Sequence, residues 1–122
     1  MTRALLIVDH GSRRAEANAT LAEVARMIEA LAPGVVVRHA HMELAEPTIA
    51  QGLADCAAAG AREVIVVPYM LAPGRHASED IPRLVADAAA AHPGLAHRVT
   101  EPLGVDAAIG DLVLRRAGLR PR

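Results

Sequence analysis

The sequence predicts an α/β fold, a single three-layer, flavodoxin-like domain built on a four-stranded parallel sheet. Short apolar runs alternate four times with stretches in which apolar residues recur at helical spacing. The best-defined runs are unbroken, as in strands that are buried on both faces of a parallel sheet. Because crossovers between parallel strands are right-handed, few strand orders remain, and the flavodoxin-like order is 2-1-3-4.

The first half of the chain predicts two strands and two helices. Residues 4–8 form the first strand, which ends in the polar loop Asp9-His10-Gly11-Ser12. A helix follows and ends at Pro33-Gly34, because apolar residues recur at spacings of four and three: Ala17, Leu21, Val24, Ile28 and Leu31. Residues 35–41 form the second strand. The second helix is expected over 47–59, with Ile49, Leu53 and Cys56 facing the core and Gly60 as its stop.

The second half repeats this alternation. The third strand is expected over 63–70, and a helix over about 78–91 is closed by His92-Pro93-Gly94. A weaker fourth strand should cover 96–101. The last helix should cover 106–117, with Ile109, Leu112 and Val113 facing inward. Residues 1–122 are therefore expected to form one domain, of which 118–122 are a tail.

Composition excludes several classes of function. Of the 122 residues, 27 are alanine and 31 are leucine, isoleucine or valine, enough for a small core. All 13 basic residues are arginines, scattered along a chain of net charge −1, and aromatic side chains are almost absent, which disfavours binding to nucleic acid. No apolar run is long enough for a membrane span or a signal peptide. We therefore expect a cytoplasmic protein, with the lone Cys56 as a small core residue rather than a reactive thiol.

Two histidines follow strands that should lie side by side. His10 comes directly after the first strand, and His76 ends the loop after the third strand, 66 residues later. Ligands bind beyond the carboxyl ends of such strands, where the strand order reverses. Either histidine alone is as easily a loop residue with a hydrogen bond, but the pair at one crevice favours a function.

Imidazole chemistry suggests what this function is. Neutral imidazole is the commonest protein ligand for divalent transition metals, and it can also accept a proton near neutral pH. Two histidines are too few for a structural metal site, so we expect a site that holds metal transiently or with ligands from outside. Asp9 either orients His10 or is a polar turn residue that ends the strand.

Charged residues surround these loops. Ser12 is expected to cap the first helix, with Arg13 and Arg14 in its opening turn, and Arg75 precedes His76. Helix N-termini and guanidinium groups attract carboxylates, although Arg13 and Arg14 also fit a solvated helix face.

Acidic residues follow the second strand and precede the third helix. Glu43 or Glu46 is a candidate base or metal relay, while Glu46 also fits an ordinary helix start. The segment Ser78-Glu79-Asp80 is adequately explained as a helix N-terminus.

The other histidines carry less weight. His41 lies close enough to the carboxyl end of the second strand to reach the crevice, and His39 lies on the same strand face. His92 and His97 should be surface residues at the opposite end of the sheet.

Several motifs together resemble those of one known family, the small class II tetrapyrrole chelatases, which are sirohydrochlorin cobaltochelatases and ferrochelatases. The resemblance spans nearly the whole chain and rests on the following segments: Val8-Asp-His-Gly-Ser-Arg13, Met42-Glu-Leu-Ala-Glu-Pro-Thr-Ile49, Val66-Val-Pro-Tyr-Met-Leu-Ala-Pro-Gly-Arg-His76, Asp80-Ile-Pro-Arg83 and Glu101-Pro-Leu-Gly104.

The resemblance implies a chelatase-like fold and the insertion of Co²⁺ or Fe²⁺, in some relatives Ni²⁺, into a sirohydrochlorin-type macrocycle without ATP. It implies that His10 is a proton acceptor and metal ligand and that His76 is a metal ligand. It also implies that the tetrapyrrole contacts Glu46 and the segment Leu71, Ala72, Pro73, Gly74, Arg75 and His76. Many relatives have glycine where this chain has Asp9, and some have histidine where it has Pro73.

Metallation requires two pyrrole N–H protons to leave as the metal enters, which fits a base and a metal donor facing the macrocycle. We expect His10, assisted by Glu43, to take protons, and arginines including Arg13 to face the carboxylates of the substrate. The resemblance also implies a homodimer, with metal as a substrate and no permanently bound cofactor. A non-catalytic carrier of metal or tetrapyrrole and a histidine-phosphatase-like enzyme stay open as alternatives, as does the choice between cobalamin and sirohaem synthesis.

Overall fold

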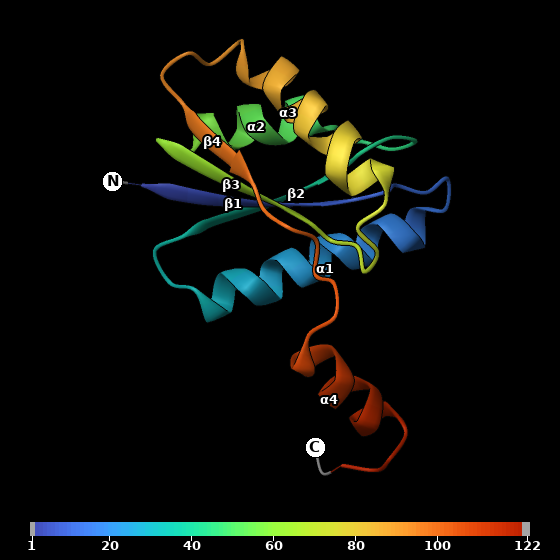
Figure 1. Ribbon diagram of the computed structural model, residues 1–122. Helices are drawn as coiled ribbons and strands as arrows, with labels where there is room; N and C mark the ends of the chain where they lie inside the picture. The colour runs from blue at the N-terminus through green and yellow to red at the C-terminus, as the bar shows by residue number, and fades with distance from the viewer. Residues whose placement is uncertain (1, 121–122) are drawn as a thin grey trace.

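The structure is a computed structural model, and it describes residues 2–120. Strands and helices alternate as expected (Figure 1). In chain order they are β1 (Arg3–Asp9), α1 (Ala15–Leu31), β2 (Val36–His41), α2 (Ile49–Ala58), β3 (Glu63–Pro68), the π-helical turn η1 (His76–Asp80), α3 (Ile81–Ala89), β4 (Ala96–Val99) and α4 (Ala107–Arg116).

The four strands form one parallel sheet in the order β2-β1-β3-β4, which confirms the order 2-1-3-4. In the central register, Leu5 of β1 lies beside Val37 of β2 and Ile65 of β3. The order reverses between β1 and β3, so the loops that follow these two strands lie together at one edge of the sheet. That edge is the expected place for a ligand.

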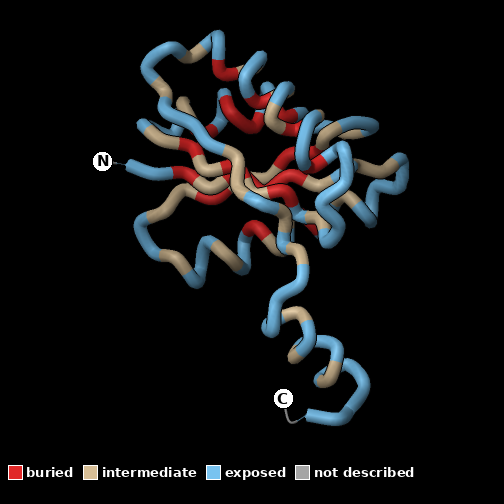
Figure 2. Tube along the Cα trace, in the orientation of Figure 1, coloured by how far each residue is buried: buried red, intermediate tan, exposed pale blue. Residues whose placement is uncertain are grey.

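Alternate residues of β1 supply the cores on the two faces of the sheet. Leu6 and Val8 are fully buried against α2 and α3, and Ile7 is buried against α1. The buried residues follow the strands and the inner helix faces in Figure 2. Gly52 lets α2 approach closely, because a Cβ atom there would lie 2.8 Å from a methyl carbon of Leu6.

Cys56, on the inner face of α2, is fully buried in the core, as expected from its position. Burial raises the pKa of the Cys56 thiol to about 11. Because the thiolate is the reactive form, this side chain is inert in the folded protein.

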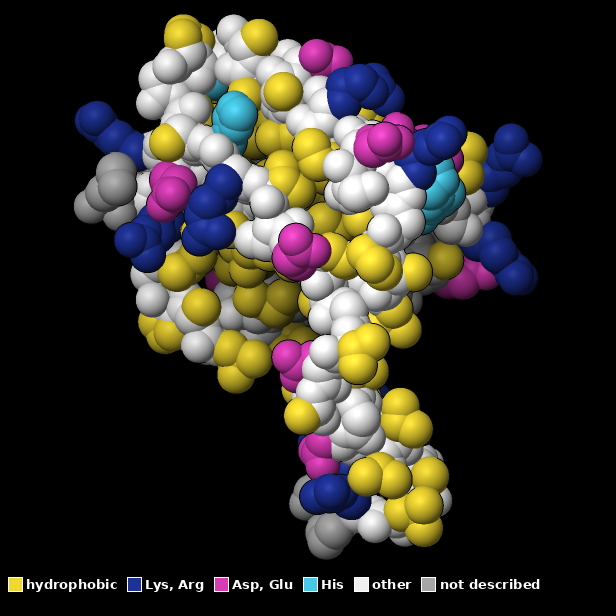
Figure 3. Space-filling view, in the orientation of Figure 1, with side chains coloured by type: hydrophobic (Ala, Val, Ile, Leu, Met, Phe, Trp, Pro, Cys, Tyr) yellow, Lys and Arg dark blue, Asp and Glu magenta, His cyan; other side chains and the backbone are white. Residues whose placement is uncertain are grey.

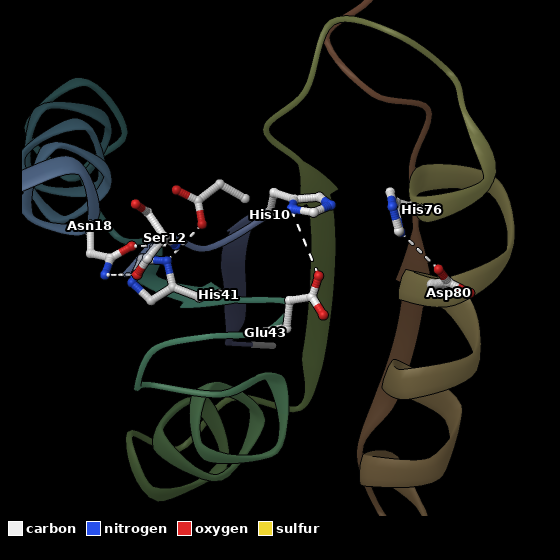
Figure 4. Close-up of polar contacts among 8 residues, drawn as sticks. His10, Ser12, Asn18, His41, Glu43, His76 and Asp80 are labelled. Carbon is white, nitrogen blue, oxygen red and sulfur yellow. Dashed lines mark hydrogen bonds and ion pairs between the residues drawn. The ribbon is translucent and has the colours of Figure 1, made fainter. Parts of the chain in front are cut away.

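The prediction that Ser12 caps α1 is wrong. The helix begins at Ala15, and Arg14 occupies the N-cap position without a side-chain cap. The Ser12 hydroxyl instead accepts from the Arg14 amide (3.0 Å), while the Asn18 side chain hydrogen-bonds to both the amide and the carbonyl of Ser12 (Figure 4). Arg13 and Arg14 therefore precede the helix rather than lie in its first turn.

The segment before α3 is also not a capped helix start. The chain is already helical from His76, where the π-helical turn η1 leads directly into α3. The Ser78 hydroxyl donates to the Gly74 carbonyl (3.0 Å), and Asp80 does not cap α3 with its side chain. The polar residues of this segment thus lie within a helical turn, which leaves Asp80 available for another partner.

The last helix differs most from expectation. It projects away from the sheet and contains no buried residue (Figures 1 and 2). Leu112 and Val113, expected to face inward, are 37% and 60% exposed. The layers of this chain are therefore α1 on one face of the sheet and α2 with α3 on the other. No helix among residues 2–120 is long and apolar enough to cross a membrane. Residues 121–122 of the expected tail lie outside the described residues.

Candidate active site

His10 and His76 meet at the carboxyl edge of the sheet. His10 follows β1 directly, and His76 opens η1 after the loop that leaves β3. Their ring centroids are 4.4 Å apart in an edge-to-face arrangement, and each side chain is about half exposed (Figure 4). The topology thus brings together the two imidazoles that the sequence singled out.

A glycine holds the His10 loop against the end of β2. Gly11 has a φ of +94°, and a Cβ atom there would lie only 1.8 Å from the Glu43 carbonyl oxygen. The Met42 amide donates to the Asp9 carbonyl (2.9 Å), and the Glu43 amide donates to the His10 carbonyl (3.2 Å). Only glycine fits this close approach of two backbone segments.

This backbone contact places Glu43 beside His10. The distance from His10 Nδ1 to Glu43 Oε1 is 3.9 Å, beyond a good hydrogen bond but short enough for a favourable interaction with a protonated ring. Both side chains are about half exposed. A carboxylate in this position supports an imidazole that accepts protons.

Asp80 orients His76, which the sequence did not predict. The distance from His76 Nδ1 to Asp80 Oδ2 is 2.8 Å, across four residues within η1. An ionised carboxylate only accepts hydrogen bonds, so Nδ1 carries the proton and Nε2 keeps its lone pair for a metal. The spacing of four between a histidine and an aspartate in a helical segment was the available signal.

Asp9 is hydrogen-bonded to His41 rather than to His10. Asp9 and His41 lie side by side in the β1–β2 register, and His41 Nδ1 donates to Asp9 Oδ1 at 2.6 Å. His41 is 1% exposed and stacks edge-to-face with His39, with ring centroids 5.6 Å apart. His41 is therefore a buried residue that ties the strand ends together, not a third imidazole beside His10.

Burial lowers the pKa of His39 below its usual value, and the neighbouring His41 adds to this shift. His39 and His41 line a groove beside α1, and Glu46 lines the same groove. Glu46 is exposed and accepts a hydrogen bond from Gln51 Nε2 (2.9 Å). Gln51 also forms a capping box with Thr48 at the start of α2. Glu46 thus lies on the α1 side of the edge, apart from the imidazole pair.

The segment Leu71–Arg75 is exposed along its whole length, and Leu71 is 59% exposed. Arg75 pairs with Glu79 (3.2 Å), and Arg13, three residues after His10 in the chain, is exposed. An open depression of about 350 Å³ beside His10 also contacts Tyr69 and Met70. A broad, shallow edge of this kind suits a flat ligand better than a small enclosed one.

Within residues 2–120, no group of three or more histidine, cysteine, aspartate or glutamate side chains is arranged to hold a metal ion. The two imidazoles alone supply fewer protein ligands than the four of a structural site. The remaining ligands of any bound metal must come from water, from a substrate or from another chain.

Comparison with known proteins decides the family. The family profile described as CbiX matches residues 4–118. The chain belongs to the CbiX family. A chloroplastic sirohydrochlorin ferrochelatase of Arabidopsis thaliana is 45% identical over 109 residues, which are 89% of this chain and 48% of that protein. This CbiX chain thus spans about half the length of that relative.

A sirohydrochlorin cobaltochelatase of Methanococcoides burtonii has nearly the same length as this CbiX chain. It is 32% identical over 124 aligned positions, covering 93% of this chain and 92% of the relative. Among solved structures, the sirohydrochlorin chelatase SirB of Bacillus subtilis subspecies spizizenii, in complex with cobalt, superposes with a TM-score of 0.88 at 34% identity. That match covers 97% of this chain and 50% of SirB.

Proposed function

We propose that this CbiX protein is a sirohydrochlorin chelatase, a lyase that inserts Co²⁺ or Fe²⁺ into sirohydrochlorin or a related tetrapyrrole without ATP. The observation that carries the proposal is the pair of half-exposed imidazoles, His10 and His76, at the switch point of the sheet. The names of the relatives support both the metals and the macrocycle.

The reaction exchanges one divalent cation for two protons. As the metal enters, two pyrrole N–H bonds break, their electron pairs become metal–nitrogen bonds, and two protons leave. In this proposal His10 accepts protons and donates to the metal, and Glu43, 3.9 Å away, stabilises the imidazolium that results. No electron is transferred, so the metal keeps its oxidation state.

His76 is the second metal ligand. Asp80 fixes the ring with a hydrogen bond to Nδ1 and leaves Nε2 for the cation. Two neutral imidazoles bind a divalent metal without enclosing it, so water and then the pyrrole nitrogens can complete its coordination. The half-exposed positions of both rings fit a cation that must be passed on.

The remaining site residues contact the macrocycle in this proposal. Arg13 lies three residues after His10 and Arg75 directly precedes His76, and their guanidinium groups suit the carboxylates at the rim of sirohydrochlorin. The exposed loop from Leu71 to His76 forms one border of the site, and Glu46 lies at the other.

The proposal includes a homodimer, because the two imidazoles leave metal ligands to be supplied from elsewhere and a second copy of the chain could supply them. The metal can be Co²⁺, Fe²⁺ or Ni²⁺, since imidazole binds all three, and supply selects among them. The cytoplasmic location, the pathway and the lack of a permanent cofactor stay predictions.

The test follows cobalt insertion by the absorbance change of sirohydrochlorin, with the wild type, His10→Ala, His76→Ala and the control His92→Ala, whose histidine lies at the opposite end of the sheet. We expect His10→Ala to abolish turnover while it still binds sirohydrochlorin, measured by fluorescence quenching. His92→Ala should retain the wild-type rate.

Multiple turnovers separate an enzyme from a carrier of metal or tetrapyrrole, because a carrier stops after one equivalent. A wild-type protein that inserts no more cobalt than its own concentration would overturn the catalytic proposal. Undiminished turnover by His10→Ala would overturn the role of this residue.

A further inference from the structure

Helix α4 is well formed, but within residues 2–120 no other helix or strand packs closely against it and none of its residues is buried. The Asp106 side chain caps it by accepting from the Ala108 amide (2.8 Å), and Arg115 pairs with Asp111. Ile109 and Val113, one turn apart, lie on one side of the helix, and Val113 is 60% exposed. Isolated helices shorter than about 12–15 residues are marginal in water, so a ten-residue helix needs a packing partner.

One half of the sheet lacks a helix on one of its faces. Helix α1 packs on β2 and β1, whereas the same face of β3 and β4 has no helix over it (Figure 1). We call this surface the open half-face; it consists of Ile65, Arg98 and the side of Val67 that the α1 core leaves uncovered. Ile65 is only half-buried, although it lies in the centre of a central strand beside Leu5.

In a doubly wound domain, a fourth helix would cover this half-face, but the chain here directs α4 away from it. The Thr100 amide donates to the Val66 carbonyl and the Leu103 amide donates to the Met70 carbonyl, each at 2.9 Å. Only Gly104, with a φ of +62°, and the fully exposed Val105 lie between Leu103 and the helix cap. The connection therefore holds α4 outside its own domain (Figure 3).

We propose that α4 of each chain packs on the open half-face of a second copy, in a reciprocal exchange. An unpartnered amphipathic helix and an unpartnered apolar sheet face in the same chain complement each other, and two copies satisfy both at once. Because the exchange is closed and two-fold, it leaves no apolar helix and no open half-face exposed.

The area that the exchange buries is sufficient for a stable dimer. A ten-residue helix is about 15 Å long, and burying half of it covers about 300 Å² of helix and as much of the sheet. Two such contacts remove about 1,200 Å² from water, which reaches the lower limit of specific protein interfaces.

The exchange also reaches the site. The connection to α4 and the His76 loop share one depression, lined by Leu71, Pro73, Pro102 and Leu103. A partner held by α4 would therefore sit against this border of the site. The exchange rests on the homodimer of the proposed function and specifies how its two copies are held together. It does not depend on which reaction the protein catalyses.

Disulfide trapping distinguishes exchange from the alternatives. The variant carries Ile65→Cys on the open half-face and Val113→Cys on α4, in the full chain; Cys56 stays out of the reaction because it is buried with a raised thiol pKa. After mild oxidation, non-reducing electrophoresis should show a covalent dimer that dithiothreitol dissolves. A bond within one chain, which runs as a monomer, or no bond at all would overturn the exchange.

Two controls complete the test. Ile65→Cys with Arg115→Cys, on the charged side of α4, should give no covalent dimer. Val113→Cys alone should also give none, and a dimer from this single variant would show α4 packing on α4 and overturn the exchange. Light scattering should find the wild type dimeric and Val113→Asp monomeric with unchanged circular dichroism, whereas a monomeric wild type or a dimeric Val113→Asp would contradict the proposal.

Metal insertion is measured on the same wild-type sample. A trapped dimer without insertion would overturn the proposed reaction and leave the exchange standing. If the wild type inserts metal but the variant with both cysteines forms no covalent dimer, the exchange would be overturned and the proposed reaction would stand.

Discussion

The two histidines of the site are held in different ways. His10 depends on backbone: Gly11 lets its loop approach the end of β2, and two amide hydrogen bonds from Met42 and Glu43 fix the distance. His76 depends on a side chain, because it lies on an exposed helical turn and the Asp80 carboxylate holds its ring by a hydrogen bond. Substitutions around His10 should therefore affect folding and activity together, while those around His76 should affect metal affinity alone.

Gly11→Ala should have the largest effect. The added methyl group would overlap the Glu43 carbonyl, and φ is positive, so the loop must move. We expect a loss of about 3 kcal/mol or more in the free energy of unfolding in urea, together with loss of cobalt insertion.

Gly34→Ala is the matched control for Gly11→Ala. Gly34 has a similar φ of +88°, but nothing lies within 4 Å of an added Cβ atom. It should lose only about 1 kcal/mol of stability and keep its activity. Equal losses in the two variants would mean that backbone strain, and not the contact with Glu43, controls the His10 loop.

Asp9→Ala should come next, with a loss of about 2 kcal/mol in the free energy of unfolding, because it leaves the buried His41 Nδ1 without an acceptor. Asp9→Asn retains an acceptor oxygen and should recover most of this loss. A wild-type melting curve for Asp9→Ala would show that the pair does not stabilise the ends of β1 and β2.

Asp80→Asn should leave stability almost unchanged, since the pair with His76 is partly exposed. The neutral amide orients the ring less firmly than the carboxylate does, so Co²⁺ affinity should fall by about tenfold or more. Calorimetric titration with Co²⁺ measures this effect, and Glu79→Gln, which removes an exposed partner of Arg75, is the control. A Kd unchanged by Asp80→Asn would remove Asp80 from the site.

The order of the strands and the meeting of His10 with His76 could be predicted, because unbroken apolar runs identify parallel strands and the topology then places the loops. The side chains that contact these histidines could not be predicted from the sequence. Whether Asp9 faces His10 or His41 depends on the β1–β2 register, which single-strand patterns do not reveal.

Two other differences have similar causes. Serine and aspartate favour both helix caps and turns, so their presence does not tell the two apart: Ser12 lies in a turn, and the segment before α3 is a π-helical turn. The periodicity of α4 correctly indicated an apolar side, but periodicity does not tell which surface covers it.

The central claim is that His10 and His76 hold the same metal ion. Its most direct test is Co²⁺ titration, with X-ray absorption of the bound cobalt, on the wild type, His10→Ala, His76→Ala and His92→Ala. We predict imidazole ligands in the wild type and in His92→Ala, with fewer of them and weaker binding in each of the other two variants. Cobalt bound with unchanged affinity and unchanged imidazole ligation in His10→Ala and His76→Ala would contradict the claim.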